Sequence, residues 1–250
     1  MKLNLKINNT KIEQVKEFCF LGVVFDECIT WKSHVKKIAS KIAVVVGTIN
    51  KLKRFLPQNI LKMIYNSLIL PHINYGLLLW GQNNGRIFKL QKWAMRAIAC
   101  SKYNAHTEPI FAKLKLLKFE DIYKVALLKF FHRYTNNSLP KYFDNFFKQK
   151  YLTHDHDTRH KNEPLPPDFK KESTKKCLRV YLPAIMETMP PHLIEDINTK
   201  KLPSFSKNAK IYFLNTYTFV CSDPNCWPCQ DHDAVSSLRL LPFYSLKTIP

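Results

Sequence analysis

The sequence predicts a mainly α-helical protein with a small N-terminal β-meander and a looser α+β region at its C-terminal end. The first observation is a helical period: between residues 32 and 150, apolar residues recur every three or four positions, which places them on one helix face. The second is a set of short apolar, β-branched runs before residue 32, a composition typical of strands. We expect a meander over 1–31, a helical bundle over 32–150, a connector over 151–176 and a further region over 177–250.

The predicted meander has three strands. LKI and KIEQV are joined by Asn8, Asn9 and Thr10, a turn composition because Asn tolerates positive φ. FCFLGVVF, residues 18–25, has the length and residue types of a buried strand. Gly22 interrupts this strand, which indicates a bulge or the close approach of another backbone segment.

Helices are predicted over 33–54, from Pro57 to Pro71, over 87–98, over 119–135 and over 140–149, with the apolar segment LPHINYGLLLWG ending at Gly81. Proline suits the first turn of a helix, where the missing N–H costs nothing, and it ends a helix elsewhere. The predicted core residues of the first helix are Val35, Ile38, Ile42, Val45, Ile49 and Leu52. Those of the second are Ile60, Leu61, Ile64 and Leu68, and those of the third are Ile87, Leu90, Ala94 and Ile98.

Composition changes near residue 151. The stretch THDHDTRHKNEPLPPDFKKESTKK is polar and charged and contains prolines, which predicts a connector or an irregular surface segment. Beyond it, CLRVYLPAIMETMP and IYFLNTYTFV are short apolar pieces without a long helical period. We therefore expect a looser α+β arrangement there.

The charge is strongly unbalanced, with 39 Lys and Arg against 19 Asp and Glu, a formal net charge of +20 and a pI near 9.6. This surplus predicts an anionic partner, most often nucleic acid, with an anionic membrane surface as the other candidate. No run of about 18 apolar residues occurs, so no membrane span is expected. The N-terminus lacks the pattern of a signal peptide, and the seven cysteines are odd in number and scattered. We expect an intracellular protein, nuclear or cytoplasmic, that is not secreted.

Most basic residues of the first helix lie off its apolar stripe. They are Lys32, Lys36, Lys37, Lys41, Lys51, Lys53 and Arg54, and Lys92 and Arg96 lie on a later helix. A solvated helix face needs no partner, whereas a face that tracks phosphates needs lysine and arginine at this density. The net charge favours phosphate contact.

Several short motifs in order resemble the C-terminal part of the reverse transcriptases of non-LTR retrotransposons, of the long-interspersed-element or Jockey-like kind. They are FCFLGVVFD, WKSHV with the lysine-rich helix after it, LKRFLPQNILKMIYNSLILPHINYGLLLWG, LQKWAMRAIACSKYNAHTEPIFAKLKLL, HDTR, and a C-x4-C-x2-C cluster near the end. The resemblance covers roughly residues 1–230.

The resemblance implies that Phe20, Leu21 and Gly22 belong to the grip that holds the primer, and that the helices from Ser33 to about Cys100 form a thumb-like bundle. In that family the catalytic Tyr-x-Asp-Asp turn, which holds Mg²⁺, lies upstream in the palm. No Asp-Asp pair occurs in these 250 residues, so we expect no catalytic residue in this chain. The expected function is that of a fragment of an RNA-directed DNA polymerase, inert alone. Its partners would be the RNA/DNA primer-template and the missing palm and fingers.

An alternative remains from another class of protein. The chain is then a basic helical interaction module, co-opted from such an element, that binds a protein or an anionic membrane surface. Nucleic-acid binding weakens steeply with salt, whereas a protein-binding groove depends on apolar anchors.

Cys221, Cys226, Cys229 and His232 form a candidate zinc site, since C-x2-C is a common half-site. The spacing is tight and a second half-site is absent, so unliganded cysteines are the favoured interpretation, with Cys177 as a distant alternative ligand. His154, His156 and His160, with Asp155 and Asp157, form a weaker candidate that suits a polar connector equally well.

Three further interpretations concern individual residues. Asp26 and Trp31 either support the primer grip, or Asp26 caps or turns the joint between strand and helix while Trp31 lies in the core; the second is favoured. His34 either contacts nucleic acid or is a solvated helix residue, and the second is favoured. Base stacking is one role for four aromatic residues, but core packing is favoured; they are Tyr65, Tyr75, Trp80 and Trp93.

Overall fold

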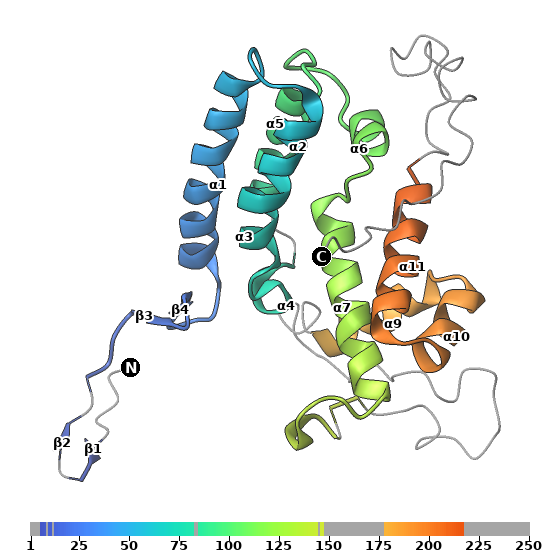
Figure 1. Cartoon of the computed structure of the whole chain (residues 1–250). Coiled ribbons are helices and arrows are strands. Elements are labelled where there is room, and N and C mark those ends of the chain that lie inside the picture. Colours follow the sequence, from blue (N-terminus) through green and yellow to red (C-terminus); the bar gives the residue numbers. More distant parts are fainter. Residues whose placement is uncertain are drawn as a thin grey trace, which may run out of the picture.

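A computed structural model describes residues 6–8, 10–11, 13–82, 85–144, 146–147 and 178–217. The described chain is mainly helical with small antiparallel hairpins at its N-terminal end (Figure 1), which confirms the mainly α-helical class with a small N-terminal β region. The α+β mixture expected beyond the connector is not found in residues 178–217, which form helices. The predicted connector, residues 151–176, lies outside the described residues, as do residues 218–250. The described part of the last region consists of three helices, α9 (Leu178–Glu187), α10 (Pro191–Thr199) and α11 (Leu202–Asn215).

The N-terminal β region is two separate hairpins rather than one meander. β1 (Lys6–Ile7) pairs with β2 (Thr10–Lys11), and β3 (Glu17–Phe20) pairs with β4 (Val23–Asp26). The prediction of a single strand over FCFLGVVF is wrong, because the chain reverses direction at its centre. Leu21 and Gly22 both have positive φ, 47° and 80°, which is the geometry of a two-residue hairpin turn.

Asp26 organises the joint between β4 and the first helix, as predicted. Its carboxylate accepts hydrogen bonds from the backbone N–H of Cys28 (3.2 Å), Thr30 (2.8 Å) and Trp31 (2.8 Å), and from the Thr30 hydroxyl. These bonds, with the Thr30 N–H first, lower the pKa of Asp26. Trp31 is half-buried and packs edge-on against Phe25, with ring centroids 5.3 Å apart.

The lysine-rich helix is α1 (Lys32–Leu52), and its apolar stripe is buried against the bundle. Four of the six predicted core residues, Val35, Ile38, Ile42 and Ile49, are buried. The other two, Val45 and Leu52, are partly buried and pack against the same core, in which Val46 is also buried. The helical period therefore located this face correctly.

The next helix does not end at Pro71. α2 (Gln58–Ile64) widens into a π-helical turn, η1 (Tyr65–Ile69), and continues as α3 (Leu70–Asn74). The backbone N–H of Leu70 donates to the carbonyl five residues earlier, at Tyr65. A π-turn lets the chain pass a proline, whose missing N–H and ring would disrupt a regular α-helix.

The π-turn also changes which residues face the core. Leu61, Tyr65, Ile69 and Ile73 are all buried although they are spaced four apart, a spacing that drifts around a regular helix. The wider turn keeps them on one face. Leu68, predicted to lie in the core, is instead exposed, because the prediction assumed a constant helical period.

The later helices match the sequence prediction unevenly. α5 (Gly85–Ile98) and α7 (Phe119–Thr135) are confirmed, and all four core residues predicted for α5 are buried. Over 140–149 the described residues contain only a short 3-10 turn, η2 (Lys141–Phe143). The short helices α4 (Leu77–Trp80) and α6 (Glu108–Leu114), and helices α9 to α11, have no counterpart in the prediction.

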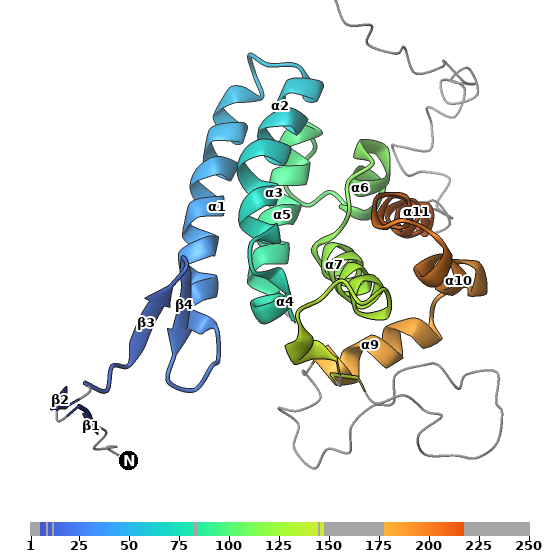
Figure 2. The same cartoon turned by 60° about the horizontal axis from the view of Figure 1, so that its bottom comes forward.

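Two apolar clusters meet at α7, which lies between α4 and α5 on one side and α9 to α11 on the other (Figures 1 and 2). One cluster fills the space between α1, α2–α3 and α5, and the other lies between α7 and the C-terminal helices. Tyr217, just after α11, belongs to the first cluster. The C-terminal helices are thus part of one packed body with the bundle.

Candidate nucleic-acid interface

Helices α1 and α5 pack along their lengths, more extensively than any other pair of described elements. Two surface hollows lie along this contact. One, of about 390 Å³, lies where both helices begin, between Lys32, Lys36 and Arg86. The other, of about 500 Å³, lies between the later parts of both helices. The helices therefore run parallel, and one seam connects the two hollows.

Five basic side chains line these two hollows: Lys32, Lys36, Lys53, Arg86 and Arg96. We call them the seam cations. Between Glu27 and Glu108 the chain contains no carboxylate side chain, and within the described residues no seam cation forms an ion pair. Uncompensated charges of one sign along a concave surface add to a field that attracts anions.

The fold places the basic residues predicted to bind nucleic acid on different surfaces. Lys32, Lys36, Lys53 and Arg96 line the seam, together with Arg86, which was not predicted as a site residue. Lys37 and Lys41 lie on another flank of α1, and the Lys37 Nζ is 3.8 Å from the Cys19 Sγ in β3. The absence of carboxylates over this stretch pointed to the region but did not distinguish Arg86 from its other basic residues.

The remaining predicted cations have other surroundings. Lys51 and Arg54 are exposed near the C-terminal end of α1. Lys92 is half-buried, with its Nζ 4.3 Å from the centre of the Phe88 ring, so part of its interaction is within the protein.

Phe20, Leu21 and Gly22 lie at the turn of the β3–β4 hairpin, with Phe20 and Leu21 exposed. Tyr75 anchors this turn, since its phenol donates a hydrogen bond to the Leu21 carbonyl. A side chain at Gly22 would meet only the Tyr75 ring, 3.7 Å away at ordinary contact distance. The prediction of a bulge or of a close backbone approach at Gly22 is therefore wrong, because Gly22 lies at a turn that needs its positive φ. Tyr75 itself is more than half exposed, so its assignment to the core was wrong.

The prediction that His34 is solvated is wrong. His34 is buried, and its Nδ1 accepts a hydrogen bond of 3.2 Å from the backbone N–H of Val24. Its Nε2 is buried with no hydrogen-bond partner among the described residues, and its ring lies edge-on to Trp80 at 5.6 Å. Burial first, and then the charge of Lys37, lower the pKa of His34, which keeps the imidazole neutral as an acceptor.

Of the four aromatic residues for which core packing was the favoured interpretation, two are in the core. Trp80 and Tyr65 are buried, and burial raises the pKa of Tyr65 to about 12 although a hydrogen bond from Gln91 lowers it. That amide is itself buried, donating to the Tyr65 hydroxyl (2.8 Å) and accepting from the Phe119 N–H (2.8 Å). Trp93 is different: half of it is exposed, at the second hollow. The core interpretation of Trp93 was wrong, because a helix period does not show where a neighbouring helix leaves a groove.

The candidate zinc ligands Cys221, Cys226, Cys229 and His232 lie outside the described residues, as do Cys177 and the His/Asp cluster of the connector. Within the described ranges, no three His, Cys, Asp or Glu side chains are arranged to hold a metal ion. Among the helices that the structure describes, none has the length and apolar character needed to cross a membrane.

In comparisons with known proteins, no family model matches this chain, and neither the curated proteins nor the solved structures gave a match. A function can therefore be proposed only from the chain's own residues.

Proposed function

We propose that this chain is a nucleic-acid-binding, thumb-like part of a non-LTR retrotransposon reverse transcriptase. The observation that carries the proposal is the α1–α5 seam, where five cations lie along two parallel helices in a stretch of chain without carboxylates. Phosphates are evenly spaced and carry no sequence information. A rigid row of cations therefore suits the backbone of a primer-template duplex.

The polymerase chemistry belongs to a separate catalytic centre in this proposal. Such enzymes use paired carboxylates to hold two metal ions at the reacting phosphate, and these 250 residues contain no Asp-Asp pair. The chain contributes grip on the duplex and does not polymerise alone. A primer-extension assay with the purified chain is expected to give no template-dependent product, and such a product would contradict this part of the proposal.

Binding to a labelled RNA–DNA duplex, measured by fluorescence anisotropy over a range of salt, tests the grip. Each phosphate contact contributes about −0.9 to the slope of log K against log salt, so one contact per seam cation gives about −4 to −5. That slope corresponds to a loss on the order of 10²- to 10³-fold in affinity between about 50 and 200 mM salt. The affinity should not depend on duplex sequence.

Vesicles containing anionic lipid provide the comparison, because a membrane surface also attracts basic helices. Tight binding to vesicles with weak binding to the duplex would favour the interaction-module alternative. Duplex binding that is unaffected by salt would contradict the proposed role of the seam.

A further inference from the structure

The second hollow of the seam, which we call the α1–α5 groove, has small residues of both helices in its lining. Ala43 and Gly47 come from α1 and Ala97 from α5. A Cβ added at Gly47 would meet nothing within 4 Å. With a volume of about 500 Å³, the groove lies in the size range of small-molecule and cofactor sites.

Two exposed aromatic residues stand at this groove. Trp93 is 50% exposed and Tyr103 is 83% exposed, and both line it. Large aromatic side chains hold much apolar surface that packing normally removes from water. At this groove the apolar surface of both side chains is accessible to solvent, and the flat ring of a ligand in the groove could stack on it.

Cations lie beside the aromatic surface. Lys53 and Arg96 both line the groove. The Nε of Arg96 donates a 2.9 Å hydrogen bond to the Ala105 carbonyl, which holds the guanidinium in place. No carboxylate lines the groove, so the site combines a flat apolar surface with positive charge.

We infer that the α1–α5 groove binds one unpaired nucleotide of a single-stranded nucleic acid. The base lies against Trp93 and Tyr103, and its phosphate lies near Lys53 and Arg96. Stacking on aromatic side chains beside a basic track is how proteins bind single strands without sequence preference. Bases inside a duplex offer no free face. The inference rests on the proposed nucleic-acid binding and adds to it that this part of the seam, whose two cations contact phosphates of either form, also takes an unpaired base.

The test compares three labelled probes with the full chain: a thymidine strand of about 12 nucleotides, an abasic strand of equal length, and a blunt duplex. The first two have the same phosphates and differ only in their bases. Base stacking contributes about 1–3 kcal/mol per base. The thymidine strand should therefore bind about 5- to 150-fold more tightly than the abasic strand.

Two variants should remove this preference while leaving affinity for the abasic strand and the duplex within about twofold. Trp93→Ala deletes the stacking surface. Gly47→Leu fills the groove without changing any charge or aromatic residue, and leucine favours a helix interior more than glycine does, so the fold is retained. Tyr142→Ala is the matched control, since Tyr142 is 94% exposed on η2, away from the groove, and it should change nothing.

Equal binding of the thymidine and abasic strands by the unmodified chain would overturn the inference. So would a preference that survives in Gly47→Leu. In either case, salt-dependent duplex binding would leave the proposed function standing. Failure to bind both the duplex and the strands would overturn the two together.

Discussion

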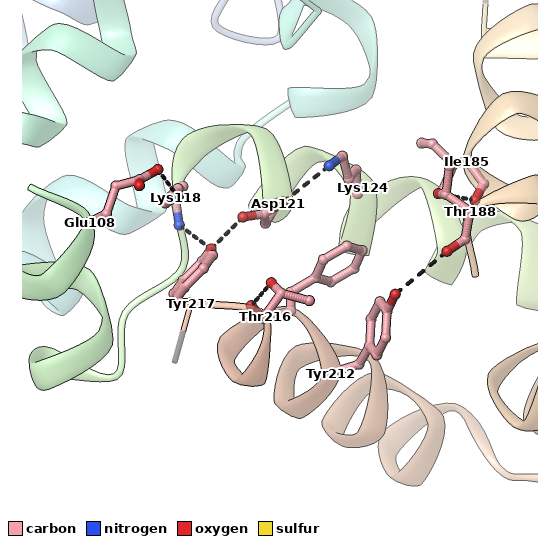
Figure 3. A network of polar contacts seen from close by, with 10 residues as sticks. Glu108, Lys118, Asp121, Lys124, Ile185, Thr188, Tyr212, Thr216 and Tyr217 are labelled. Atoms are coloured by element: carbon pink, nitrogen blue, oxygen red, sulfur yellow. Dashed lines mark hydrogen bonds and ion pairs between the residues drawn. The ribbon is translucent and has the colours of Figure 1, made fainter. Parts of the chain in front are cut away.

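The phenol of Tyr217 donates a hydrogen bond to the buried carboxylate of Asp121, 96 positions earlier in the chain (Figure 3). The same phenol accepts a hydrogen bond of 3.0 Å from the backbone N–H of Lys118. Asp121 also pairs with the Lys124 Nζ at 3.3 Å. Tyr217 thus joins the end of α11 to the beginning of α7, and burial, followed by the Asp121 charge, raises its pKa.

Tyr217→Phe is therefore expected to destabilise the fold. The change keeps the ring but leaves the Asp121 carboxylate and the Lys118 N–H without this partner, at a cost of about 1–3 kcal/mol in the free energy of unfolding. Urea unfolding measures it. Tyr212→Phe is the matched control, because the Tyr212 hydroxyl is 3.5 Å from the Thr188 carbonyl at the surface; its effect should stay below about 0.5 kcal/mol. Equal effects would contradict the role given to Tyr217.

Replacing Gly81 or Gly47 with alanine should change the stability of the fold in opposite directions. A Cβ at Gly81 would lie 2.5 Å from the Leu77 carbonyl oxygen and 2.7 Å from the Tyr123 ring, so Gly81→Ala should destabilise the protein by about 1–3 kcal/mol. Gly47 lies inside α1 with open space around it, so Gly47→Ala should stabilise it by about 0.5–1 kcal/mol. The midpoint of urea unfolding, measured for each variant, tests both predictions. If both midpoints shift in the same direction, the close packing described at Gly81 is contradicted.

The stability of the fold should fall as the pH falls below about 6.5, the ordinary pKa of histidine, because of His34. Its folded pKa is lowered, so below that pH the unfolded chain binds a proton that the folded chain does not. The contribution of His34 to the free energy of unfolding is complete above the pKa that His34 has in the unfolded chain. It is lost as the pH falls toward the lower pKa that His34 has in the folded chain. An NMR titration of the His34 ring should give a pKa below 6.5, and a value above it would be incompatible with the Val24 N–H bond.

Removing seam cations should change the salt dependence of duplex binding, whereas removing other lysines of α1 should not. Lys36→Ala combined with Arg86→Ala removes two seam cations and should lower the slope of log K against log salt by about 2. Lys37→Ala combined with Lys41→Ala removes the same charge from another flank and should leave the slope unchanged. If both pairs lower it equally, net charge rather than the seam controls binding.

Local pattern was enough for much of the fold. The periods of α1, α5 and α7 identified the helices, and those of α1 and α5 also located their buried faces, since one apolar face must be buried wherever such a helix packs. The role of Asp26 was also accessible, because its partners lie within five positions. The reversal at Leu21 and Gly22 was missed, because an apolar run of eight residues does not distinguish one strand from two.

Other features depend on segments far apart in the sequence. The burial of Gln91 is one, since its amide joins Tyr65 to Phe119 across three elements. His34 is another: its polar character indicated a solvated residue, but β4 supplies a donor to one nitrogen and Trp80 covers the ring. Neither partner can be read from the residues beside it.

The sequence by itself determined the helical class, the excess of positive charge and the absence of carboxylates between Glu27 and Glu108, because these follow from composition and local period. Only the tertiary structure decided which cations lie together. A helical period gives the face on which Lys36 or Lys41 lies, but not which helix packs beside that face. The parallel packing of α1 and α5 brings Lys36 beside Arg86 and opens a groove at Gly47 and Trp93. That choice is made by the fit of two apolar faces separated by more than thirty residues of chain.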